Sequence, residues 1–132
     1  MQEKKSYEYV VIRLVPRVER EEFLNVGVML YAASRKFLQM KFHLDKKRIR
    51  NFNPDTDLGL TQKYLETFER ISRGDKTAGA IAQLPGPERF RWLSATRSTT
   101  LQMSKVHSGM CSDPEAKLTE LYEQLVLPMV KS

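Results

Sequence analysis

Seven side chains of this sequence have the chemistry of a site that binds an anion or a polar partner. They are Arg13, Glu22, Asn25, Arg97, Ser98, Gln102 and His107. Arg97 precedes three hydroxyl side chains at positions 98, 99 and 100, and a guanidinium beside hydroxyl donors can hold a phosphate or carboxylate through charge-assisted hydrogen bonds. Alternatively, these residues cap the preceding short helix and Arg97 pairs with Glu22. The sequence leaves both interpretations open.

Proton transfer has one candidate in this set. His107 could act as a general acid or base while Arg97 stabilises charge, which is the minimum for a small metal-independent phosphodiesterase. A second proton-transfer group would be needed, and the only other histidine, His43, belongs to a different predicted strand. The sequence has no phosphate-binding loop, dinucleotide-binding motif, zinc-protease motif or nucleophile elbow. We therefore predict no catalytic residue and no cofactor, and phosphodiesterase activity is the second alternative function.

The composition does not favour a metal site, a disulfide or a membrane span. The single cysteine, Cys111, excludes an internal disulfide, and with only two histidines the ligands are too few for structural zinc. Cys111 is expected to pack as a small apolar residue. No apolar stretch approaches the roughly 18 residues of a membrane span, and the charged N-terminus leads into a predicted strand. We expect a cytoplasmic protein without a metal.

Three runs alternate apolar and other residues with the period of a strand. They cover residues 7–15, 24–32 and 37–44. Every even position from Leu24 to Ala32 is apolar. Because short segments join the runs, we expect an antiparallel meander, beginning with a hairpin, whose strands share one continuous apolar face.

Two poor strand residues, Asn25 and Gly27, lie two apart inside the second run. The missing side chain at Gly27 could let another backbone, an aromatic ring or a ligand approach beside the Asn25 amide. The alternative is a bulge at Gly27, with Asn25 bonded to a nearby loop.

The second half of the chain has the period of helices. Apolar stripes with helical spacing comprise Leu60, Tyr64, Leu65, Phe68 and Ile71, then Leu118, Leu121, Tyr122, Leu125 and Val126. A short helix begins near Pro87, and residues 98–106 form a weaker strand candidate. The order predicts one α+β domain over residues 1–132: an antiparallel sheet of about four strands with its two main helices packed on one face.

The net charge of +6 arises in the first fifty residues, which hold twelve basic and six acidic side chains. Most of the excess is in a basic segment formed by Arg35, Lys36, Lys41, Lys46, Lys47, Arg48 and Arg50. Such a cluster can bind nucleic acid or an acidic protein. Such a cluster is more often a solvated loop and a strand edge, which lysine protects from aggregation.

Three stretches resemble a known family. They are Arg13-Leu14-Val15-Pro16, the run from Glu22 to Leu30, and Trp92 to Ser98 with Leu101-Gln102. Together they resemble the uncharacterised bacterial DUF 3037 family over most of the chain, and Glu22, Asn25 and Gly27 match its most specific pattern. That pattern has glycine before the Glu22 position, where this chain has Glu21. The family has no assigned reaction, so the resemblance implies no activity. Its members are often encoded beside HipA-like serine/threonine kinases, so the resemblance implies such a kinase as a possible partner.

The leading hypothesis is a non-catalytic protein-binding or regulatory module, which contacts its partner through a half-polar sheet face or the basic segment. Nucleic-acid binding by residues 35–50 is the first alternative, and it predicts an affinity that falls steeply with salt. Apolar side chains on the second face of the sheet, Phe23, Met29 and Tyr31, also favour either a homodimer or a covered sheet.

Overall fold

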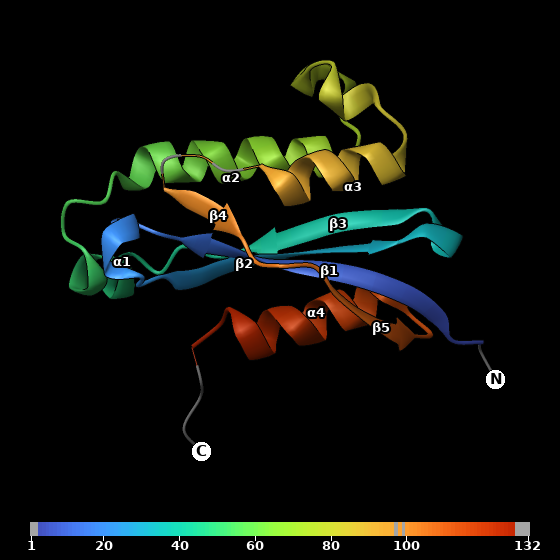
Figure 1. The fold of residues 1–132 in the computed structure, drawn as a ribbon, viewed down its shortest axis with the longest axis horizontal. Coiled ribbons are helices and arrows are strands. Elements are labelled where there is room, and N and C mark those ends of the chain that lie inside the picture. Colours follow the sequence, from blue (N-terminus) through green and yellow to red (C-terminus); the bar gives the residue numbers. More distant parts are fainter. Residues whose placement is uncertain (1–2, 97, 99, 129–132) are drawn as a thin grey trace.

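The computed structural model describes residues 3–96, 98 and 100–128, which form an antiparallel sheet of five strands between helices (Figure 1). The strands are β1 (Lys5–Leu14), β2 (Leu24–Ala32), β3 (Phe37–Phe42), β4 (Leu101–Met103) and β5 (His107–Cys111). Their order is β3-β2-β1, and β4 and β5 both pair with the other edge of β1. The α+β class and the antiparallel sheet are confirmed, with five strands in place of about four.

Among the described residues, four α-helices accompany the sheet: α1 (Lys46–Phe52), α2 (Leu58–Ser72), α3 (Gly86–Ala95) and α4 (Pro114–Leu125). Asp45, Asp57 and Asp113 cap α1, α2 and α4, because each carboxylate accepts a hydrogen bond from an N–H of the first turn. In the part of the chain that the structure describes, no helix combines the length and the apolar character that crossing a membrane requires.

Helices cover both faces of the sheet (Figure 1). On one face, α2 and α3 pack on Val10, Ile12 and Met29. On the other face, α4 packs on side chains that include Val28 and Leu30. The prediction that both main helices share one face is therefore wrong for α4. The sheet has two apolar faces, and each needs its own cover.

A one-residue bulge in β2 determines which of its side chains face α2 and which face α4. Ile12 pairs with Gly27, but the next residue, Arg13, pairs with Asn25, so Val26 is an extra residue. Val26 consequently packs toward α2, whereas Val28 packs toward α4. The prediction that all even positions of β2 share a face is wrong, since one added residue reverses the alternation beyond it.

Gly27 allows β3 to approach closely at this bulge. A Cβ at Gly27 would lie 3.1 Å from the Lys41 carbonyl oxygen, 3.1 Å from Ile12 Cδ1 and 3.2 Å from Phe42 Cβ. The space is therefore filled by a neighbouring backbone and two side chains. The structure combines the two alternatives for this stretch: the backbone of β3 approaches Gly27, and β2 has a bulge, while Asn25 bonds to the end of α4 and not to a loop.

β4 and β5 form one strand along β1 that is interrupted at Ser104. The Ser104 N–H donates to the Val11 carbonyl (2.9 Å), and its buried hydroxyl oxygen accepts from the Val11 N–H (2.8 Å). The strand predicted over 98–106 is thus shorter than expected, and β5 is an addition to the prediction.

The turn before β2 contains Glu21 in the left-handed conformation (φ 55°, ψ 27°). A residue with a Cβ is strained there by about 1 kcal/mol, whereas glycine is not. We expect Glu21→Gly to raise the free energy of unfolding by about 0.5 kcal/mol, the strain relief being offset in part by the greater freedom of the unfolded chain. Urea denaturation measures this. Glu19→Gly, in the preceding 3-10 turn, is the control and should be neutral or destabilising; equal destabilisation by both changes would contradict the prediction.

Candidate functional site

Helix α4 leaves part of its side of the sheet open. It packs mainly on β2 and β3, and along β1, β4 and β5 several side chains on its side of the sheet are less covered. Side chains on this open face are only partly buried, and they include Tyr9, Arg13, Gln102 and His107. The half-polar surface predicted from the sequence therefore lies beside α4.

Three of the seven predicted site residues lie side by side: two are on this open surface, and Asn25 borders it at the end of α4. Arg13 in β1 pairs with Gln102 in β4 on one side and with Asn25 in β2 on the other. Paired residues of adjacent antiparallel strands project to the same face. Gln102, Arg13 and Asn25 thus form a polar row across three strands.

The Arg13 guanidinium lies over the Phe23 ring, with its carbon 4.2 Å from the ring centroid. Phe23 remains 44% exposed, so the pair has a free apolar surface. The Arg13 Nε atom is buried and has no acceptor among the described residues, and within that part of the chain no carboxylate pairs with Arg13. Arg13 is therefore oriented by an aromatic ring and keeps an unpartnered hydrogen-bond donor.

Asn25 contributes the complementary atom. Its Nδ2 group donates to the Leu125 carbonyl at the end of α4 (3.0 Å), which fixes the amide. Its Oδ1 atom is buried and finds no donor in the described residues. An unsatisfied buried polar group costs about 1–3 kcal/mol. Neighbouring strands thus each hold one buried polar atom, a donor in β1 and an acceptor in β2, that has no partner among the described residues.

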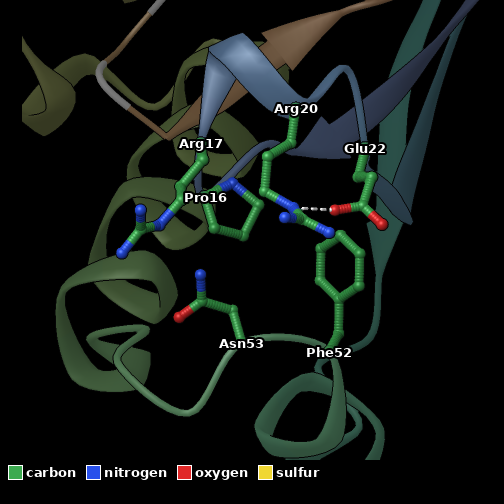
Figure 2. A pocket seen from close by; sticks show the side chains of 6 residues that line it. All are labelled: Pro16, Arg17, Arg20, Glu22, Phe52 and Asn53. Carbon is green, nitrogen blue, oxygen red and sulfur yellow. Dashed lines mark hydrogen bonds and ion pairs between the residues drawn. The ribbon is translucent and has the colours of Figure 1, made fainter.

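The remaining predicted residues are apart from the row. Glu22 is exposed and forms an ion pair with Arg20 beside a hollow of about 30 Å³ that Phe52 and Asn53 also line (Figure 2). That volume is about enough for a single water molecule.

Ser98 stabilises the turn that leads into β4, because its hydroxyl oxygen accepts from the Leu101 N–H (2.9 Å). This is a structural use of the hydroxyl. Arg97 lies outside the described residues, so its proposed ion pair with Glu22 and its role in an anion site stay predictions.

His107 stacks on the Tyr9 ring, with 5.0 Å between the ring centroids. Tyr9 and Arg13 are four positions apart in an extended strand, a distance of about 13 Å. His107 therefore does not join the polar row. Farther along β5, burial raises the pKa of the Cys111 thiol, which packs against α4 as a small apolar residue.

The basic segment is divided between the two ends of the sheet (Figure 1). Arg35 and Lys36 lie in the turn between β2 and β3. Lys41 donates to the Thr119 hydroxyl of α4 (2.8 Å). The other four cations, Lys46, Lys47, Arg48 and Arg50, are exposed on α1, past the far end of β3. The six residues of β3 span about 20 Å, so the seven cations do not form one patch.

Wider hollows lie away from the polar row. One of about 470 Å³ is lined by Tyr31, Lys36 and Arg89, near the start of α3. Another of about 390 Å³, between α1 and α2, is lined by Lys46, Arg50 and Gln62. Over the described residues, no three histidine, cysteine, aspartate or glutamate side chains are grouped to hold a metal ion.

Phe23 was expected on the second face of the sheet, but its contact with Arg13 was not predicted. The pairing follows from diagonal contact across the β1–β2 hairpin. That register could not be deduced because the bulge at Val26 shifts it by one residue.

The comparisons with known proteins identify a family. Residues 9–126 match the model of a family described as "Protein of unknown function (DUF3037)". The comparisons with curated proteins and with solved structures gave no match. The matched residues include β2, the bulge and the polar row, and extend over nearly the whole sequence. The chain therefore belongs to the DUF3037 family.

Proposed function

We propose that this protein is a non-catalytic binding module whose open sheet face holds a segment of a partner protein. The observation that carries the proposal is the pair of unpartnered buried atoms on adjacent strands, Arg13 Nε and Asn25 Oδ1. A group that satisfies both must offer an acceptor beside a donor. A peptide amide does so with its C=O and N–H.

The surroundings of these atoms suit a peptide. Phe23 offers an exposed ring beside the row, and aromatic and arginine side chains are the usual anchors of protein interfaces. The Gln102 side chain adds an amide on the next strand. The family resemblance suggests a HipA-like kinase as the first partner to test.

Nucleic-acid binding has less support. The cations of residues 35–50 are divided between two ends of the sheet, and Lys41 is engaged with Thr119. The group on α1 is small, and Asp45 at its N-cap offsets part of its charge. A phosphodiesterase would need Arg97 beside His107, and His107 is stacked on Tyr9.

The test is capture of partners from the native host with a tagged protein, with and without nuclease. We expect a stoichiometric protein that survives nuclease treatment with the wild type and is lost with Phe23→Ser, because the serine removes the apolar anchor and leaves Arg13 without its support. Mass spectrometry identifies the protein, and absorbance measures any nucleic acid.

Trp92→Ser is the matched control, since Trp92 is also an exposed aromatic (39%) but belongs to α3, on the other side of the sheet. It should leave capture unchanged. Two results together would favour nucleic-acid binding instead of this proposal. Every partner would be lost upon nuclease treatment, and binding would be lost in Lys46→Glu/Lys47→Glu but not in Phe23→Ser.

A further inference from the structure

Strand β5 has an outer edge that the described chain leaves unpaired. β5 pairs with β1 on its inner side and with no other strand among the described residues. Such an edge is a template for pairing with another chain. Proteins usually protect edges with charged residues, proline or irregular backbone.

The outward backbone groups of β5 belong to Ser108 and Met110. Val11 exchanges hydrogen bonds with Ser104, and the Val15 N–H donates to Thr100, so the odd residues of β1 direct their backbone groups toward this edge. Tyr7 and Tyr9 follow the same alternation and pair with Gly109 and His107. The even residues of β5 therefore turn their N–H and C=O groups outward.

Within β5 the edge lacks the charged residues and proline that protect other edges. From Val106 to Ser112 the sequence has no acidic residue, lysine, arginine or proline. The side chains of Val106 and Met110 are 45% and 58% exposed. By contrast, the opposite edge strand, β3, contains Lys41 and follows Arg35 and Lys36, so a second copy there would bring cations together.

The charges that flank β5 select one occupant and one register. Lys105 precedes the uncharged run and Asp113 follows it, and both are exposed. Antiparallel pairing of two copies about Gly109 places Lys105 of each copy opposite Asp113 of the other. The Asp113 Oδ1 atom caps α4, which leaves Oδ2 for an ion pair.

We propose that β5 pairs with β5 of a second copy, antiparallel and centred on Gly109, to make a sheet continuous across a homodimer. Ser108 of one copy then lies opposite Met110 of the other in hydrogen-bonded pairs. The two Met110 side chains become diagonal neighbours and cover each other. This inference is independent of the proposed function, since it uses the edge of the sheet and not the polar row.

Sedimentation velocity over a series of concentrations tests the dimer. One short strand pair makes a small interface, so we expect a monomer–dimer equilibrium that shifts with concentration. Ser108→Pro should give monomer throughout, because it removes an outward N–H while the inner pairing with β1 is kept. Met110→Lys is the second variant, and it places like charges near the two-fold axis. Circular dichroism should show both variants folded.

Cross-linking tests the register. In a Cys111→Ala background, Ser108→Cys and Met110→Cys chains are mixed and oxidised. Opposed residues have Cα atoms about 5.5 Å apart, within the range of a disulfide. We expect a covalent dimer from the mixture and little from either chain alone, whereas Val106→Cys mixed with Met110→Cys should not cross-link. A wild type that is monomeric throughout, a dimer that persists in both edge variants, or the reverse cross-linking pattern would overturn the proposal.

Discussion

Gly109→Ala should destabilise the protein by about 2 kcal/mol, although it adds a single methyl group. The Tyr7 ring lies across Gly109, so that a Cβ would be 2.6 Å from Tyr7 Oη, 2.7 Å from Cζ and 2.9 Å from Cε1. Tyr7 is itself buried, and burial raises the pKa of its hydroxyl. The ring can move away only by displacing its packing between the sheet and α4. Urea denaturation at fixed protein concentration measures the change.

A double-mutant cycle separates this contact from a general effect of alanine in a strand. With Tyr7→Leu the ring is gone, so adding Gly109→Ala should cost little more. With Tyr7→Phe the ring carbons remain near the new methyl group, so the cost should persist. Gly59→Ala, inside helix α2, should instead stabilise by up to about 1 kcal/mol. Equal costs of Gly109→Ala in the wild-type and Tyr7→Leu backgrounds would exclude the ring as the cause.

The strand pattern was predictable because alternation is local. The alternating runs of residues 7–15, 24–32 and 37–44 lie close to the observed bounds of β1, β2 and β3. These signals depend on neighbours in sequence, and tertiary contacts agree with them.

The covering of the sheet was not predictable from the same signals. A one-residue bulge leaves the alternation of β2 intact in the sequence while it reverses which side chains face α4. Asn25 and Gly27 indicated an irregularity, but not that Val26 is the extra residue. An extra residue before Gly27 and one after it would turn different side chains of β2 toward α4. The position of α4 could therefore be determined only from the strand register.

The candidate site was predicted in part for a similar reason. Arg13, Asn25 and Gln102 were named as polar residues of strands, and pairing across three strands brings them together. Glu22, Ser98 and His107 were grouped with them by chemistry alone, and each has a local partner instead. Residue type could not reveal those partners.

Arg13→Met should weaken partner capture at least tenfold and yet leave the protein as stable as the wild type or about 1 kcal/mol more stable. A charge-assisted hydrogen bond is worth about 1.5–3 kcal/mol, so its loss is about 10- to 100-fold in affinity. Arg13 makes no ion pair within the described residues, and its buried Nε lacks an acceptor there. Methionine removes the unsatisfied donor, and its thioether can replace the guanidinium carbon over the Phe23 ring. Capture assays and urea denaturation measure the two effects.

Opposite effects on binding and stability distinguish a binding residue from a structural one. Asn25→Ala should weaken partner binding and also lower the stability. The loss of stability should be about 1 kcal/mol, because the change removes the hydrogen bond to the Leu125 carbonyl that holds the end of α4. Arg17→Met, an exposed arginine just beyond β1, should change neither. If Arg13→Met instead lowers stability as a core replacement does, by 2 kcal/mol or more, and capture falls only as the protein unfolds, then Arg13 is a structural residue. The binding surface would then have to lie away from the polar row.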